Sequence, residues 1–104
     1  MKKSSNKSKT RKPSHPGVVF KKLILEELGI SISDAAKMMK FPRSTLSYVL
    51  NDRGRLTPEI AKRFAKFTNT SVASWYNMQT AVEIWEVENS WVAEDVERFS
   101  AFGD

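Results

Sequence analysis

The chain has 104 residues, 40% of them hydrophobic, and contains no cysteine. This length supports one modest hydrophobic core, and the absence of cysteine excludes disulfides and thiolate metal sites and fits a reducing cytoplasm. No apolar run reaches the roughly 18 residues of a membrane span, and no apolar segment follows the basic N-terminus as in a signal peptide. We therefore expect a cytoplasmic protein that spans no membrane.

The net charge of +5 is distributed unevenly. Residues 1–14 contain six basic side chains and no acid, residues 15–70 contain ten basic and five acidic ones, and residues 71–104 contain one basic and seven acidic ones. The sign of the charge therefore reverses near residue 71. The first two blocks favour a polyanionic partner, and the last block disfavours one.

Residues 1–14, "MKKSSNKSKTRKPS", are rich in lysine and serine. With almost no apolar side chain, this segment cannot bury enough surface to offset its chain entropy, so we expect a disordered basic tail. Two interpretations stay open: a solubilising tail, or a basic arm that contacts phosphates or folds on a partner.

A first helix is predicted over residues 16–28. Pro16 suits a first helical turn, and Gly29 is a typical stop. The apolar residues at helical spacing are Phe20, Leu23, Ile24 and Leu28. The single histidine, His15, stands at the helix entrance, where we expect it to cap or pack rather than to catalyse.

A second helix over residues 32–39 would begin after Ser31 or Ser33 as its N-cap. A third is predicted over residues 42–51, with a narrow apolar stripe formed by Leu46, Val49 and Leu50. Its other side carries hydroxyls, an amide, a phenol and a guanidinium, and no acid. These side chains are Ser44, Ser47, Tyr48 and Asn51, with Thr45 at the edge and Arg43 in the first turn.

Two further helices are predicted over residues 58–67 and 72–89, with Thr57 and Ser71 as N-caps. Residues 91–104 should add a short final helix. No strand pattern or internal repeat is present. The fold class is therefore all-α, with a domain over residues 15–90 and a C-terminal helical extension over 91–104.

The second and third helices are short, joined by a tight turn and flanked by a helix on each side. This is the helix-turn-helix arrangement, in which the second helix of the pair enters a major groove of DNA. Compact donors and acceptors read base edges, and basic groups and helix starts contact phosphates. The residues expected at DNA are Ser33, Arg43, Ser44, Thr45, Ser47, Tyr48, Asn51, Arg53, Arg55 and Lys62. The alternative is an ordinary small bundle whose hydroxyls cap helices or face water.

The C-terminal third carries more apolar surface than four short helices can cover. A palindromic operator would suit a homodimer, and the residues expected at its interface are Trp75, Val82, Ile84, Trp85 and Trp91. The alternative is that these side chains only complete the core of the monomer. An enzyme is not expected, because the sequence shows no thiol, metal-ligand cluster or glycine-rich phosphate loop; no cofactor or metal follows from it either.

Three stretches resemble the HigA family of type II antitoxins, also called VapI-like, within the XRE/lambda-repressor class of helix-turn-helix regulators. The marks are the His-Pro-Gly start at residues 15–17 and the run of Trp75, Asn77 and Gln79 followed by Trp85. The resemblance covers roughly residues 15–86. Two positions depart from the family pattern: Lys40 stands where the turn usually has glycine, and Pro42 where the recognition helix usually has a Ser or Thr cap.

The resemblance implies a five-helix domain that dimerises through its later helices and represses its own operon at a palindromic operator. It also implies a toxin partner of the HigB type, a RelE-like ribonuclease that cleaves mRNA. The recognition helix then corresponds to residues 42–50, and the DNA contacts fall on Arg43, Ser44, Thr45 and Tyr48. The alternatives are a stand-alone phage- or plasmid-type repressor without a toxin, and a protein-interaction module whose basic surface is incidental.

Overall fold

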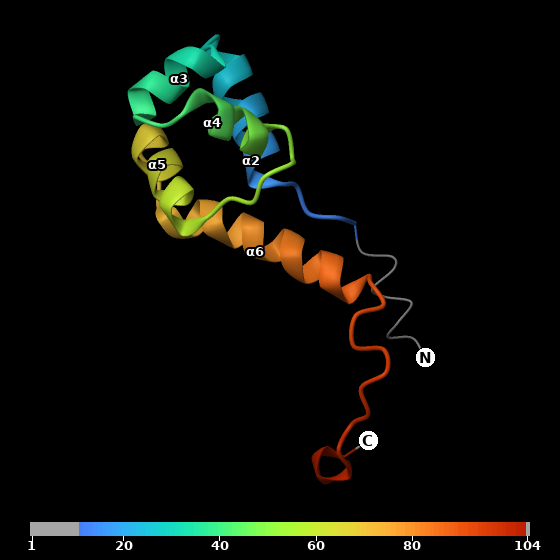
Figure 1. Ribbon diagram of the computed structural model, residues 1–104. Coiled ribbons are helices and arrows are strands. Elements are labelled where there is room, and N and C mark those ends of the chain that lie inside the picture. Colours follow the sequence, from blue (N-terminus) through green and yellow to red (C-terminus); the bar gives the residue numbers. More distant parts are fainter. Residues whose placement is uncertain (1–10, 104) are drawn as a thin grey trace.

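The computed structural model describes residues 11–103, and these form five helices in a compact head with one projecting arm (Figure 1). The first helix consists of α2 and a directly continuing π-helical segment, η1. The elements in order are α2 (Pro16–Val19), η1 (Phe20–Glu26), α3 (Ile32–Met39), α4 (Arg43–Leu50), α5 (Pro58–Thr68), α6 (Val72–Glu88) and the 3₁₀ helix η2 (Ser100–Phe102). No strand occurs among the described residues, so the predicted all-α fold class is confirmed.

Three of the predicted helix starts are confirmed by capping hydrogen bonds. Ser31 Oγ accepts from the backbone N–H of Asp34 at 3.0 Å, and Thr57 and Ser71 cap α5 and α6 in the same way. His15 caps the first helix, since its Nδ1 accepts from Gly17 N–H at 3.0 Å. Each cap satisfies a backbone donor that the helix itself leaves unpaired.

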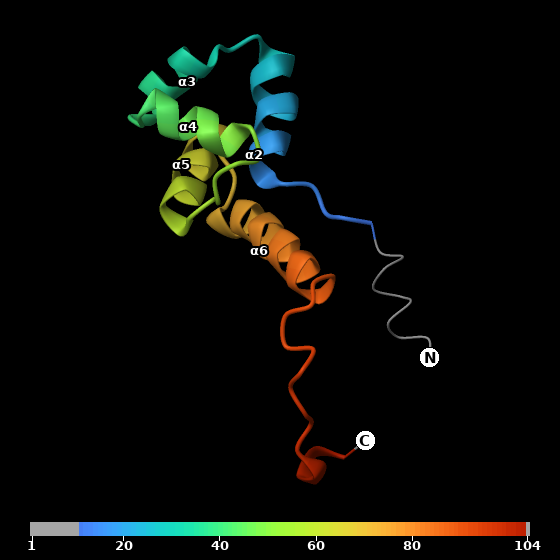
Figure 2. The same ribbon diagram turned by 45° about the vertical axis from the view of Figure 1, so that its right-hand side comes forward.

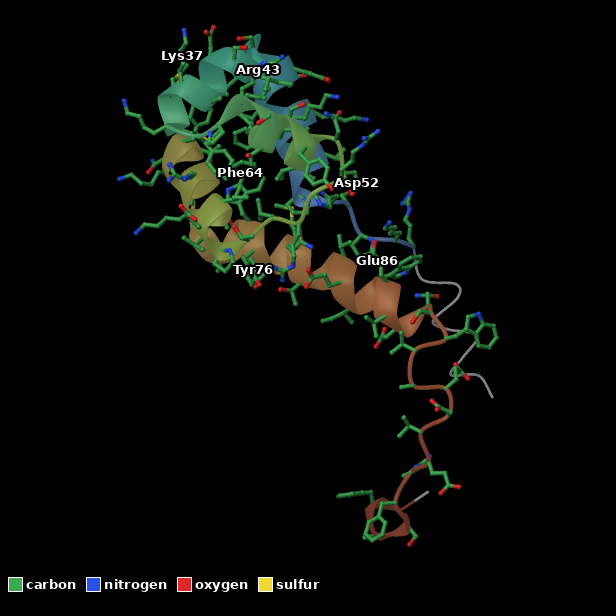
Figure 3. The ribbon with its side chains drawn as sticks, viewed as in Figure 1. Lys37, Arg43, Asp52, Phe64, Tyr76 and Glu86 are labelled. Atoms are coloured by element: carbon green, nitrogen blue, oxygen red, sulfur yellow. The ribbon has the colours of Figure 1, made fainter. Side chains whose placement is uncertain are left out.

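The core is centred on three aromatic rings from different helices. Phe20 and Phe64 stack with ring centroids 4.0 Å apart, and the Trp75 ring meets both edge-on at 5.6 and 5.4 Å. Figure 3 shows Phe64 among the helices, whereas Lys37 projects outward from α3. These contacts hold the first helix, α5 and the start of α6 together. None of the helices in the described part of the chain combines the length and hydropathy needed to cross a bilayer.

The prediction of which apolar residues of the first helix are buried was wrong in part. Leu23 and Leu28 are 63% and 66% exposed, and Leu25 is buried instead. The reason is the π-helical segment, whose wider turn pairs residues five apart, so that Leu25 shares the face of Phe20. The predicted stripe assumed ordinary α-helical spacing throughout.

The C-terminal extension is less helical than expected. Residues 91–99 contain no helix, and only Ser100–Phe102 make a single 3₁₀ turn. Asn89 ends α6 with its side-chain amide donating to the carbonyl of Trp85 at 2.8 Å, and Ala93 has a positive φ of 66°. A short helix is stabilised mainly by packing, and this segment leads away from the head (Figure 1), so it has nothing to pack on.

Candidate nucleic-acid interface

Helix α4 is docked on the head by the predicted stripe. Leu46, Val49 and Leu50 are at most 2% exposed. The first helix approaches α4 so closely that a Cβ on Gly17 would lie 2.1 Å from the carbonyl oxygen of Val49. Gly17 is therefore required by packing, and it brings the backbones of α2 and α4 together. One side of α4 is fixed, and the other faces outward.

The outward side of α4 and the following loop enclose a hollow of about 400 Å³. Its lining consists of Ser44, Ser47, Tyr48, Asn51 and Arg53. All five were expected at DNA from the sequence, and the fold brings them together. Thr45 is exposed on the same short helix. The surface offers hydroxyl, amide, phenol and guanidinium groups, which both donate and accept hydrogen bonds.

The loop after α4 is built around Tyr48. Its carbonyl accepts from the N–H groups of Arg53 and Gly54, both at 3.1 Å. A Cβ on Gly54 would come within 2.5 Å of the Tyr48 ring, so the absence of a side chain there lets the ring lie over the loop. The position of the phenol in the hollow thus depends on Gly54.

Several of the expected DNA residues also hold one another. Arg43 Nε donates to Ser33 Oγ at 2.9 Å, which links the first turns of α3 and α4. The side-chain amide of Asn51 donates to the Ser47 carbonyl at 2.7 Å, and its oxygen accepts from Lys21 at 3.5 Å. These bonds set the side chains in position before any ligand binds.

Arg55 has a different place from the one expected. Its guanidinium forms an ion pair with Glu83 and donates to the hydroxyl of Tyr76 at 3.1 Å, so that it ties the loop to α6. The hydrogen bond to Glu83 is the main cause that raises the pKa of Arg55, and the same bond lowers the pKa of the Glu83 carboxyl. A cation already paired in this way is a weaker partner for phosphate, and Arg55 does not line the hollow on α4. Lys62 is exposed on α5 and does not line it either.

Gln79 is a supporting residue whose role the sequence did not reveal. It is 3% exposed, its oxygen accepts from Leu56 N–H at 2.8 Å, and its nitrogen donates to Glu83 at 3.0 Å. It therefore fixes the far end of the same loop. Its role could have been predicted from the position of an amide within the apolar stripe of α6. A polar group buried there is normally hydrogen-bonded.

Arg63, on α5, supports the turn between α3 and α4. Its Nη1 donates to the carbonyls of Met39 and Lys40 at 2.7 and 3.1 Å, and the guanidinium lies 5.2 Å from the centre of the Phe41 ring. Lys40 has a left-handed backbone with φ of 54°, and Pro42 provides no side-chain cap. Arg63 thus compensates for the departure at Lys40 by donating to the carbonyls at the end of α3.

The residues expected at a dimer interface separate into two groups. Trp75 and Val82 are 5% and 3% exposed, because the head of the same chain already covers them. Ile84 and Trp91 are 53% and 84% exposed, and Trp85 is half-buried. The surface available to a partner therefore lies on the outer half of α6 and beyond it.

Only part of the basic N-terminal tail falls within the described residues. Residues 11–14 are not helical, and Lys12 forms a 3.3 Å ion pair with Glu86 and lies 5.8 Å from the centre of the Trp85 ring. Glu86 lies further along α6 than Tyr76, toward the end of that helix (Figure 3). The expectation of disorder over residues 1–10 lies outside the described residues.

The chain is similar to known helix-turn-helix proteins in sequence and structure. The Helix-turn-helix family model matches residues 21–75. An uncharacterised HTH-type transcriptional regulator of Escherichia coli K12, YbaQ, is 40% identical over 81% of this chain and 74% of its own length. Antitoxin HigA-1 of Vibrio cholerae is 32% identical over 81% of this chain and 79% of its own length. The Pseudomonas aeruginosa antitoxin HigA, solved with the higBA promoter, has a TM-score of 0.76 over 85% of this chain and 96% of that one, at 20% identity.

Proposed function

Because the chain belongs to the helix-turn-helix family, we propose that it is a sequence-specific repressor that reads operator DNA with α4. The observation that carries this proposal is the acid-free outer side of α4, where five polar side chains line one hollow. An exposed helix with compact donors and acceptors suits the major groove, and positive charge nearby supplies phosphate attraction. A regulator of this kind acts where the DNA is, in the cytoplasm, and is not an enzyme.

We assign individual residues to DNA with the support of their positions. Ser44, Thr45, Ser47, Tyr48 and Asn51 are available to base edges. Ser33, Arg43, Arg53 and Lys62 are assigned to phosphates and to holding the helix in register. Arg55 is removed from this group because Glu83 and Tyr76 occupy its guanidinium.

We further propose that the protein is the antitoxin of a type II pair and neutralises a HigB-like ribonuclease. The V. cholerae relative is an antitoxin by name, and the alignment with it extends over most of both chains. An antitoxin that represses its own operon needs one surface for DNA and another for protein. The basic head and the acidic, apolar C-terminal third provide two such surfaces.

The test has two parts. Titration of the DNA upstream of the gene at several salt concentrations should show an affinity that falls steeply with salt and exceeds that for random DNA. Expression of the neighbouring gene alone should arrest growth, and co-expression of this chain should restore growth. If the chain binds its operator but no neighbouring gene encodes a toxin, the protein is a stand-alone repressor. An affinity for DNA that neither falls with salt nor differs between operator and random DNA would contradict sequence-specific binding.

A further inference from the structure

The start of the first helix and the loop after α4 are far apart in the sequence and meet in space. In both ribbon views the loop passes beside the start of α2 (Figures 1 and 2), and Asp52 is labelled at this crossing in Figure 3. His15 Nε2 lies 3.6 Å from Oδ1 of Asp52. The crossing is tightly packed, because Pro16 is fully buried and Gly17 lies against the carbonyl of Val49.

The imidazole of His15 has a defined orientation at this crossing. Its Nδ1 accepts from Gly17 N–H at 3.0 Å, and the side chain is 9% exposed. Since Nδ1 is an acceptor, the proton of the neutral ring is on Nε2, the nitrogen that faces the carboxylate of Asp52. The N–H dipole attracts the carboxylate, and solvent weakens this attraction less at a buried ring than on an open surface.

Asp52 stands at a critical position for a surface that binds DNA. It is the one acid within residues 43–58, and its neighbours Asn51 and Arg53 both line the hollow on α4. Asp52 does not line that hollow, and together with His15 it lines a separate one of about 230 Å³. A carboxylate directed into the hollow on α4 would repel phosphates. The contact with His15 therefore holds this acid away from the surface proposed for DNA.

The backbone of Asp52 also depends on its surroundings. Its φ is 60°, in the left-handed region, which is strained for a residue with a side chain. Such a conformation persists where the contacts around it determine it. The next two N–H groups, those of Arg53 and Gly54, both donate to the carbonyl of Tyr48. A change at Asp52 would therefore move the backbone that carries Arg53.

We propose that His15 is a positioning residue for operator binding and acts through Asp52. It keeps the loop in the conformation that presents Arg53 to DNA, and it holds the Asp52 carboxylate against the first helix. This inference rests on the proposed binding of DNA by α4. It adds a residue that lies at the start of another helix and does not line the hollow on α4.

His15→Asn separates capping of the first helix from contact with the loop. The asparagine oxygen can still accept from Gly17 N–H, because asparagine is a favourable N-cap, but its shorter side chain has no group in the position of Nε2. In the DNA-free chain, the amide hydrogens of Arg53 and Gly54 should exchange with solvent about threefold faster than in wild type. The amide of Ala61, early in α5, is the internal control and should keep its rate.

Operator binding tests whether this loop conformation matters for DNA. The measured quantity is the ratio of operator affinity to random-DNA affinity at one salt concentration, which reduces the influence of overall charge. His15→Asn and Asp52→Gly should each lower this ratio about three- to tenfold, and glycine adopts a φ of 60° without strain. Asp52→Asn is the conservative control. It keeps an oxygen toward Nε2 and tolerates the same φ, so its ratio should stay within about twofold of wild type.

The double variant shows whether the two residues act together. If His15 acts through Asp52, adding His15→Asn to Asp52→Gly should lower the ratio no further. Reductions that multiply would overturn the proposal, and so would equal exchange rates at Arg53 in His15→Asn and wild type. A wild-type chain that does not prefer its operator would contradict the proposed function instead, and the exchange rates would still show whether His15 holds the loop.

Discussion

At the scale of single residues, side chains of one type have different roles because of their neighbours. Arg53 lines the hollow on α4, Arg55 is bound by Glu83, and Arg63 holds the turn before α4. A guanidinium has five donors in a fixed plane, so it can bind carbonyls or carboxylates as readily as phosphate. The sequence shows three similar cations near one motif, and only their partners assign their roles.

Substitution of Thr45 and Tyr48 tests whether these side chains contact DNA bases. Replacing both with alanine should remove about 1–3 kcal/mol of discrimination for each base that is no longer read, while the phosphate-binding residues keep weak non-specific binding. Competition between operator and random DNA measures the ratio of the two affinities. Equal reductions of affinity for both DNAs would contradict the assignment of these residues to bases.

Substitution of Arg63 tests whether this side chain stabilises the turn between α3 and α4. Arg63→Ala removes two hydrogen bonds to the carbonyls that end α3 and should destabilise the fold by about 1–3 kcal/mol in urea unfolding. Lys62→Ala, one position earlier on the exposed side of α5, should change stability by less than about 0.5 kcal/mol. If the two variants were equally stable, the turn would not depend on Arg63.

At the scale of elements, the recognition helix is positioned by contacts at both of its ends. The turn before α4 relies on Arg63, and the loop after it is tied to α6 by Arg55, Gln79 and Glu83. α4 alone has only eight residues and could not hold its shape without this packing. Changes on α5 and α6, away from the expected DNA surface, should therefore alter binding.

The link between the loop and α6 should depend on pH through Glu83. Its pKa is lowered from an ordinary value of 4.5, mainly by the hydrogen bond from Arg55, so the folded state binds this proton less readily than the unfolded state. The resulting stabilisation is complete above pH 4.5 and is lost as pH falls through the lowered pKa. Wild type should therefore exceed Glu83→Gln in unfolding free energy at neutral pH, with a difference that shrinks in acid. Glu88→Gln, at a residue without an ion pair in the described chain, is the control, and it should change the unfolding free energy at neutral pH by less than about 0.5 kcal/mol.

At the scale of the whole molecule, the hydrophobic core uses only part of the chain. Every described residue of the hydrophobic core precedes residue 83, and residues 91–103 contribute none. Removing residues 91–104 should change the unfolding free energy by less than about 0.5 kcal/mol relative to the full-length chain. Chemical unfolding of the truncated and of the full-length chain measures the difference. A large decrease in the unfolding free energy would show that the removed residues pack on the helices of their own chain.

The order and starts of the helices up to α6 follow from the sequence because caps, prolines and apolar spacing act locally, as at Ser31, Thr57 and Ser71. The polar side of α4 follows for the same reason, since Leu46, Val49 and Leu50 leave only one side to face outward. Other features depend on contacts between residues far apart in the chain. The π-helical turn that buries Leu25, the capture of Arg55 by Glu83 and the use of Arg63 at a distant turn are of this kind. No local pattern encodes them, because each is decided by which partner the packed helices bring within hydrogen-bonding or van der Waals distance.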